Sequence, residues 1–303
     1  MQLCFDATRF GTGLDGGLQL AAEKGISAIE YSFAPFTTPA KSKGYLDGKE
    51  KKFLASVCKM SKQLGVTIAC LNLDFCLKPE KKANKTFSAM VGKLAHVAEA
   101  VDCRKISILL APGDDEQWLE MACEQLLSLD SELKSANVGL LIRLATAPEF
   151  RGRSLKSWNA MAPQDWRDLI STSPGIGLSF SPADCVWLGI DYLKILPGLA
   201  SAVEHIEAHD IEIVRELLND SGIYGPLWWR YRLPGKGQVD WTQLIEALKL
   251  YEFKGAFSIH LDDEFVPVDQ ESLEEALAAS VKFLTPLVSD YNGVQSASLR
   301  NLI

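Results

Sequence analysis

The sequence predicts a single α/β domain in which eight parallel strands close into a barrel with helical crossovers between them. Short β-like runs alternate with longer amphipathic stretches along the chain, which is the pattern of a parallel sheet with helices between its strands. Eight such runs within 303 residues fit a (β/α)8 barrel better than an open sheet. No Gly-rich phosphate-binding sequence follows any run, which removes the best support for a nucleotide-binding open sheet.

The elements follow one another in a regular order. The predicted strands are Gln2–Asp6, Ala28–Ser32, Thr67–Asn72, Lys105–Leu110, Gly139–Leu144, Gly177–Ser181, Ala202–Ala208 and Ala256–Leu261. The predicted helices carry apolar residues three and four positions apart. They are Asp15–Lys24, Glu50–Leu64, Asn84–Val101, Glu116–Ala136, Trp241–Leu250 and Leu273–Leu284. No linker or composition step divides the chain, so we expect one domain over 1–303, with a loosely specified tail from about residue 286.

Two long connections interrupt this pattern after the second and seventh strands, at Phe33–Lys49 and Asp210–Gln238. Long loops at the carboxyl ends of strands are where such barrels place specificity.

Composition excludes several classes of partner. The chain has 31 Lys and Arg against 39 Asp and Glu, a formal net charge of −8, which argues against nucleic acid or an anionic membrane as the main partner. The first residues lack the pattern of a secretory leader, and no apolar run is long enough to span a membrane, so we expect a cytoplasmic protein. The seven cysteines show no paired spacing and are predicted to be reduced core residues.

Polar residues near the strand ends are predicted to point into the barrel, because side chains alternate between the two faces of a strand. On the fifth strand Arg143 alternates with apolar residues, and Glu207 and His260 do so on the seventh and eighth. The result is a predicted ring at the C-terminal mouth, where barrel enzymes hold their active sites. Its members are Asp6, Glu30, Asn72, Arg143, Ser181, Glu207 and His260.

Each of these residues also has a structural interpretation. Asp6 and Glu30 could equally cap or pair with a neighbouring loop. His205 is predicted to be a hydrogen-bonded core residue, and its four-residue spacing from His209 is a weak metal signal because the segment is a predicted strand. Arg143 cannot lose its charge, so it requires an anionic partner or ligand. We expect it to pair with Glu207.

Several stretches of the chain are similar to one known family. They are Gly177–Asp184 with Leu188–Asp191, His205–Asp210, Arg232–Trp241 and Lys254–Asp263. With Ala28–Tyr31, they make the sequence resemble the xylose isomerase-like TIM barrels, a broad group of sugar and sugar-phosphate isomerases and epimerases that also contains endonuclease IV. The Leu-Pro-Gly-Lys-Gly-Gln-Val-Asp-Trp segment is the most specific match.

The resemblance implies a metal site that this chain has altered. Enzymes of the group hold one divalent ion with Glu, Asp, His and Glu on strands five to eight. The matching positions here are Arg143, Ser181, Glu207 and His260, and Asp184 stands where the group has a second His. Glu207, His260 and Asp184 could still form a rearranged set of oxygen and nitrogen ligands. A guanidinium beside them would repel an ion, however, and a serine hydroxyl replaces a carboxylate poorly. We therefore expect no metal and no other cofactor, with Arg143 taking over part of the electrostatic role of the ion.

Two functions follow from the resemblance, both with a small carbohydrate or sugar phosphate as partner. In the first, the protein is a metal-free isomerase or epimerase: Glu207 or His260 moves a proton next to a carbonyl, and Arg143 stabilises the enediolate oxygen. In the alternative, it is a non-catalytic carbohydrate-binding or regulatory barrel. The predicted substrate-binding residues are Glu30, Asn72, Ser181, Asp184, Trp228, Trp229 and Arg232.

The segment 228–232 also has a third interpretation. It is rich in Trp, Tyr and Arg, the residue types that are enriched at protein interfaces, so it could equally form a hydrophobic lid or a homo-oligomer contact.

Overall fold

The computed structural model describes residues 1–33, 46–81, 85–113, 115–144, 162–223, 225 and 228–300. In this part of the chain eight parallel strands form a closed barrel in the order β1-β10-β7-β6-β5-β4-β3-β2. The predicted (β/α)8 barrel is confirmed, and all eight strands lie where the sequence predicts them. They are β1 Gln2–Asp6, β2 Ala28–Phe33, β3 Thr67–Leu77, β4 Lys105–Leu110, β5 Gly139–Leu144, β6 Gly177–Phe180, β7 Val203–Ala208 and β10 Ala256–Ile259.

The chain divides into two compact units. Among the described residues, the N-terminal unit comprises residues 6–144 and 162–179, and the C-terminal unit comprises residues 1–5 and 180–300. The expected single domain over 1–303 remains a prediction.

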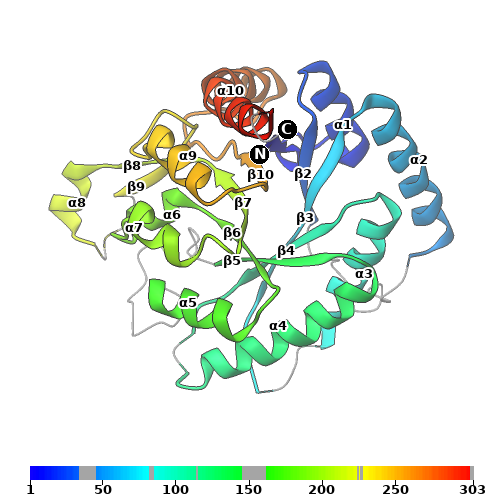
Figure 1. Ribbon diagram of the computed structural model, residues 1–303, viewed down its shortest axis with the longest axis horizontal. Helices are drawn as coiled ribbons and strands as arrows, with labels where there is room; N and C mark the ends of the chain where they lie inside the picture. Colours follow the sequence, from blue (N-terminus) through cyan, green and yellow to red (C-terminus); the bar gives the residue numbers. More distant parts are fainter. Residues whose placement is uncertain are drawn as a thin grey trace. The chain divides into compact units, whose positions relative to one another are not determined.

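In the N-terminal unit the helices lie on the outer side of the strands of that unit (Figure 1). They are α1 Gly13–Glu23, α2 Gly48–Leu64, α3 Lys85–Ala100, α4 Trp118–Ser135 and α5 Pro163–Thr172. Each of β2 to β5 pairs in parallel with the next strand of the chain. Helix α2 begins with a reciprocal capping box between Asp47 and Glu50, which satisfies backbone donors at the helix start.

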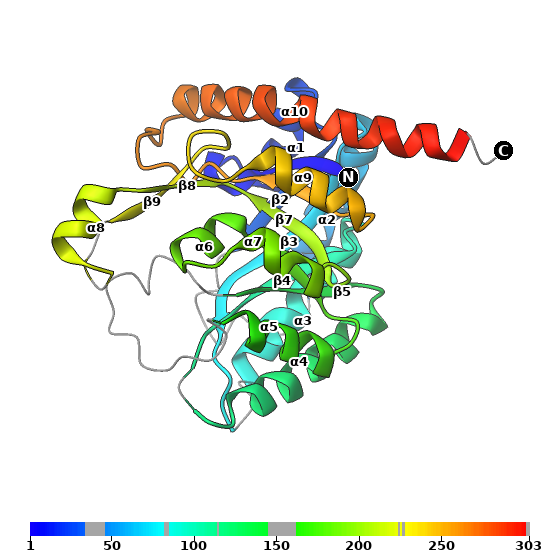
Figure 2. The ribbon, with the colours of Figure 1, turned by 60° about the vertical axis from the view of Figure 1, so that its left-hand side comes forward.

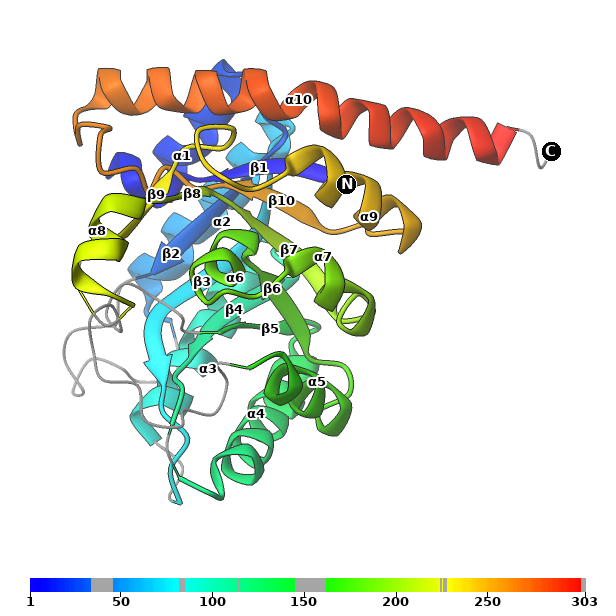
Figure 3. The same ribbon diagram turned by 90° about the vertical axis from the view of Figure 1, so that its left-hand side faces the viewer.

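In the C-terminal unit β1 pairs with β10 and β10 with β7, all in parallel. The helices are α6 Pro182–Trp187, α7 Tyr192–Ile195, α8 Arg215–Ser221, α9 Trp241–Leu250 and α10 Gln270–Arg300. Helix α10 continues through Pro286 to Arg300 (Figure 3), where the sequence predicts a loosely specified tail. No helix among the described residues is long and apolar enough to cross a membrane.

The long connection after β7 contains structure that the sequence analysis did not predict. Strands β8 (Asp210–Ile213) and β9 (Trp229–Arg232) form an antiparallel pair, and α8 lies at their far end (Figure 2). This pair was missed because strands of four residues are too short for a clear alternating pattern. Most of the other long connection, residues 34–45, lies outside the described residues.

One carboxylate fixes the start of this connection. Asp210 is fully buried and accepts four hydrogen bonds of 2.8 to 3.0 Å. The donors are the backbone N–H groups of Ile211, Gly235 and Val239 and the indole N–H of Trp241. Gly237 lies so close to the Ile211 carbonyl and the Asp210 carboxylate that a Cβ atom there would overlap both. Asp210 therefore joins the start of β8 to the turn that leads into α9.

We expect Asp210→Ala to lower the free energy of unfolding by roughly 3 to 5 kcal/mol, because it leaves four donors without their acceptor. Asp240→Ala is the matched control: it removes an exposed helix cap on Gln243 and should cost about 1 kcal/mol. Urea unfolding followed by circular dichroism measures both. Equal losses in the two variants would contradict the central role of Asp210.

Candidate active site

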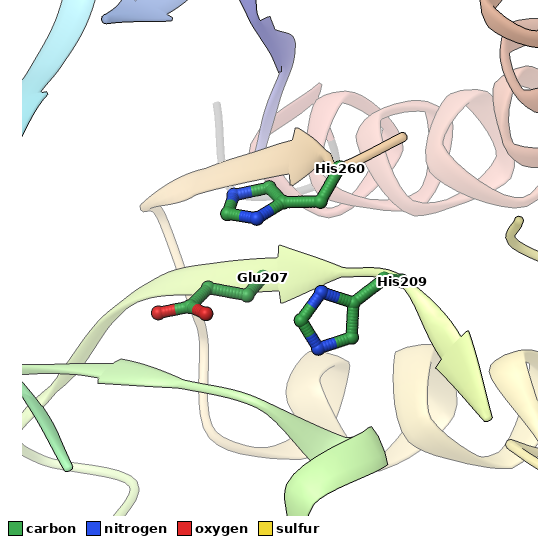
Figure 4. Close-up of side chains that lie close together, drawn as sticks. All are labelled: Glu207, His209 and His260. Carbon is green, nitrogen blue, oxygen red and sulfur yellow. The ribbon is translucent and has the colours of Figure 1, made fainter. Parts of the chain in front are cut away.

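Three buried side chains converge in the C-terminal unit: Glu207 on β7, His209 just after β7, and His260 just after β10 (Figure 4). Their exposed fractions are 7%, 3% and 5%. Each offers a carboxylate oxygen or ring nitrogen, and these atoms lie within 4.8 Å of one another. We call this group the Glu–His–His cluster.

The strand register explains why these three residues meet. Glu207 and His209 are two positions apart in extended chain, so they share a face. Ser258 on β10 lies opposite Glu207, and the His260 N–H continues the ladder with a 3.1 Å hydrogen bond to the Ala208 carbonyl. His260 therefore lies beside the last residue of β7, Ala208, and next to His209, which follows it.

His209 is held by Ser181, the residue that caps α6. The Ser181 hydroxyl accepts a hydrogen bond from the Asp184 backbone N–H at 3.1 Å and lies 3.0 Å from His209 Nε2. The other ring nitrogen, Nδ1, is buried and has no hydrogen-bond partner among the described residues. The His209 ring also contacts Tyr231 and His260, with ring centroids 4.3 and 5.4 Å apart.

Burial lowers the pKa of His209 below 6.5, and the neighbouring His260 lowers it further, while Asp184 and Glu207 act in the opposite direction. His209 is therefore a neutral imidazole at neutral pH.

Asp184 is committed to hydrogen bonds with aromatic side chains. The Tyr231 hydroxyl donates to Asp184 Oδ1 at 2.5 Å, and the Trp187 indole N–H donates to the same oxygen at 3.4 Å. Burial, with the charge of Asp184, raises the pKa of Tyr231 well above 10, so the phenol keeps its proton and remains a donor. Asp184 therefore holds Tyr231, whose ring packs against His209 of the cluster.

The two predicted substrate-binding tryptophans, Trp229 at the start of β9 and Trp228 just before it, are buried. Trp229 is 1% exposed and stacks on Trp187 with ring centroids 5.0 Å apart. Trp228 is 7% exposed and donates its indole N–H to the Ile223 carbonyl at 3.0 Å. Both indole rings pack within the protein, and their contact with a sugar remains a prediction.

Arg232 alternates with Tyr231 along β9 and makes a different set of contacts. Its Nε donates to Asp263 at 3.0 Å, and its Nη1 donates to Glu212. The guanidinium lies 4.8 Å from the ring centre of Phe265. These contacts link β9 to the segment after β10, so the structure gives Arg232 a structural role that the sequence analysis did not anticipate.

The remaining predicted residues lie in the N-terminal unit. Asp6 accepts the Thr8 N–H at 2.9 Å and caps a short 3-10 helix, Ala7–Phe10, which is the capping role left open by the sequence. Glu30 and Asn72 are each 1% exposed, and the Asn72 amide donates to the Glu30 carboxylate. Arg143 lies on β5 opposite Ser179 of β6. Its pairing with Glu207 remains a prediction.

The residues at the implied metal positions do not fit the ion of the related enzymes. Arg143 is a cation, the Ser181 oxygen already caps α6 and bonds His209, and Asp184 is held by Tyr231. Among the described residues, the Glu–His–His cluster has ligand atoms of a kind that could bind a metal. One of its members, His209, does not stand at any of the metal positions that the family resemblance implies.

The sequence analysis did not select His209 for the site. Its two-residue spacing from Glu207 was the signal that could have found it, provided that the extended chain continues past Ala208. The other spacing, four residues from His205, suits a metal pair on a helix and is a weak signal in a strand.

We expect the stability of the protein to fall as the pH drops below 6.5, partly through His209. The unfolded chain takes up this proton more readily than the folded chain, so the stabilisation is present above pH 6.5 and is lost as the pH falls toward the lower, folded pKa. His209→Gln should reduce the pH dependence by up to about 1.4 kcal/mol per pH unit. Urea unfolding between pH 7.5 and 5.0 measures this, with the exposed His96→Gln as control. Parallel pH profiles for wild type and His209→Gln would contradict it.

Comparison with known proteins supports the fold and the family. The family model for the xylose isomerase-like TIM barrel matches residues 18–287. YfiH, an uncharacterized protein of Bacillus subtilis (strain 168), is 26% identical over 129 residues, a match that spans 39% of this chain and 40% of YfiH.

Solved structures share the fold over nearly the whole chain. A xylose isomerase domain protein from Alicyclobacillus acidocaldarius matches with a TM-score of 0.70 at 19% identity, covering 96% of this chain and 99% of its own. The probable 3-DHS dehydratase AsbF from Bacillus anthracis matches with a TM-score of 0.69 at 15% identity, covering 94% and 99%. A D-psicose 3-epimerase matches with a TM-score of 0.69 at 13% identity, covering 95% and 99%. The chain belongs to the xylose isomerase-like TIM barrel family.

Proposed function

We propose that this protein is an isomerase or epimerase of a small carbohydrate or sugar phosphate, and that the Glu–His–His cluster is its reaction centre. The observation that carries the proposal is the convergence of one carboxylate and two imidazoles in a buried group at the ends of β7 and β10. The carboxyl ends of barrel strands are where enzymes of this fold act. Neighbouring structures include a D-psicose 3-epimerase and an L-ribulose 3-epimerase, which supports the substrate class.

The proposed reaction starts with removal of a proton from the carbon next to a carbonyl. In an isomerisation, Glu207 or His260 takes this proton and returns it to the adjacent carbon; in an epimerisation, one of the two takes the proton and the other donates a proton to the opposite face of the same carbon. An epimerisation needs an acid–base group on each side of the carbon, and the cluster offers two such groups. Asp262 lies 3.8 Å from His260 Nδ1, at the side of the imidazole.

The proposed reaction uses no divalent ion at the positions implied by the family, because those positions hold a cation and a committed hydroxyl. In the N-terminal unit, Arg143 is proposed to stabilise the developing oxyanion. Glu30 and Asn72 are proposed to bind substrate hydroxyl groups.

Exchange of carbon-bound hydrogen with solvent tests the reaction without knowledge of the product. The protein is incubated in D2O with a panel of ketoses, aldoses and their phosphates, and proton NMR follows loss of the signal next to the carbonyl. We expect exchange with at least one sugar, and a fall of about 10² to 10⁴-fold in Glu207→Gln. Glu246→Gln, an exposed carboxylate on α9, should exchange at the wild-type rate.

The same samples distinguish the alternative function. Saturation-transfer NMR reports binding of each sugar independently of exchange. Sugar binding without exchange in the wild-type protein would overturn the enzymatic proposal in favour of a non-catalytic carbohydrate-binding barrel. Exchange that persists at the wild-type rate in both Glu207→Gln and His260→Gln would remove the cluster from the reaction.

A further inference from the structure

One ring nitrogen of His209, Nδ1, is buried and makes no hydrogen bond with any described residue. Its Nε2 is taken by Ser181, and its Nδ1 has no hydrogen-bond partner among the described residues although it is removed from water. Figure 4 shows one nitrogen of the His209 ring on the side that faces His260. A buried polar group without a partner is costly, so its retention points to a ligand atom that completes the hydrogen bond.

The hydrogen bonds of Ser181 indicate which nitrogen of His209 carries the proton. The Ser181 oxygen already accepts the Asp184 N–H as the cap of α6. Its own hydroxyl proton has one acceptor among the described residues, His209 Nε2 at 3.0 Å. When Ser181 donates to Nε2, the single proton of the neutral imidazole lies on Nδ1. Nδ1 is then an N–H donor that faces the cluster.

We propose that neutral His209 donates its Nδ1–H to the carbonyl oxygen of the substrate, and that Ser181 is the positioning residue that fixes this tautomer. The proposal rests on the proposed function and adds a catalytic residue to it. The C–H bond next to the carbonyl breaks, its proton goes to the base, and the electron pair forms the C=C bond of an enediol or enediolate. The carbonyl oxygen gains the negative charge at the position where Nδ1–H donates.

A neutral donor suits this role in a buried site. The lowered pKa of His209 keeps the imidazole uncharged, so the N–H is present throughout the neutral range without the cost of a buried positive charge. A fixed donor aimed at a developing oxyanion needs no reorganisation during the reaction, and removing one such donor typically costs about 10² to 10³ in rate. His209 would thus polarise the carbonyl from within the C-terminal unit.

The same geometry separates this role from metal binding. If His209 bound an ion through Nδ1, the nitrogen left without a protein partner, that nitrogen would have to offer its lone pair, with the proton on Nε2 and Ser181 as its acceptor. In that arrangement the Ser181 hydroxyl proton would have no acceptor among the described residues. The two roles therefore require opposite tautomers of one side chain.

Long-range proton–nitrogen NMR on the full-length protein reads the tautomer directly. The chain has four histidines, so His96→Gln, His205→Gln, His209→Gln and His260→Gln assign the signals. We expect His209 to be neutral with its proton on Nδ1 at pH 7.5. Ser181→Ala should lose this preference, and Ser181→Thr, which keeps the hydroxyl, should retain it. A proton on Nε2 in the wild-type protein would overturn the proposal.

Zinc titration of chelator-treated protein provides the second measurement. We expect no stoichiometric binding of Zn²⁺ at micromolar concentration and no change in the His209 signal. One Zn²⁺ bound per chain, lost in His209→Gln but not in His96→Gln, would overturn the donor role in favour of a metal ligand.

Kinetics of the exchange reaction complete the test. His209→Leu and Ser181→Ala should lower kcat about 10² to 10³-fold with little change in KM, and Ser181→Thr should restore most of the rate. The tautomer and zinc measurements use no substrate. A wild-type protein with the Nδ1–H tautomer that exchanges no sugar would therefore overturn the proposed function, whereas exchange together with the Nε2–H tautomer would overturn only the role of His209.

Discussion

The parallel pairing of β10 with β7 is the constraint on which the candidate site depends. The register places Ser258 opposite Glu207 and continues to the hydrogen bond between the His260 N–H and the Ala208 carbonyl. A shift of one residue in this register would turn His260 to the other face of the sheet and remove it from Glu207 and His209. The buried Asp210 carboxylate fixes the chain at the next position after His209, so the cluster lies between two rigid features of the backbone.

The sequence was sufficient for the fold because the barrel repeats a strong local pattern. The predicted strands Lys105–Leu110 and Gly139–Leu144 match β4 and β5 to the residue, since their apolar residues must be covered by helices. The site was harder to predict because it depends on side-chain partners. The pattern that selected Glu207 and His260 also selected Asp6, which caps a 3-10 helix instead. Alternation predicts the direction of a side chain but not the atom it meets.

Two sets of contacts in the site could not be predicted from the hydrophobic periodicity of the sequence. Arg232 was grouped with the aromatic residues of 228–231, but its partners Glu212 and Asp263 come from β8 and the segment after β10, and β8 and β9 were not predicted. Asp184 was matched to the position where the resemblance implies a second His, and its hydrogen bond to Tyr231 joins residues 47 positions apart in the chain. Such long-range polar contacts carry no periodic signal in one sequence, so only coordinates reveal them.

The chemistry open to the Glu–His–His cluster depends on the hydrogen bonds that the polar groups around it make with one another. Tyr231 and Trp187 engage Asp184, and Asp184 in turn donates its backbone N–H to Ser181. This arrangement leaves the Ser181 hydroxyl proton for His209, and it leaves the second nitrogen of His209 for a ligand. Ser181 and Asp184 are therefore joined to His209 and Tyr231 by hydrogen bonds. Under the proposed function, the neutral imidazole held by Ser181 supplies a hydrogen-bond donor that polarises the carbonyl.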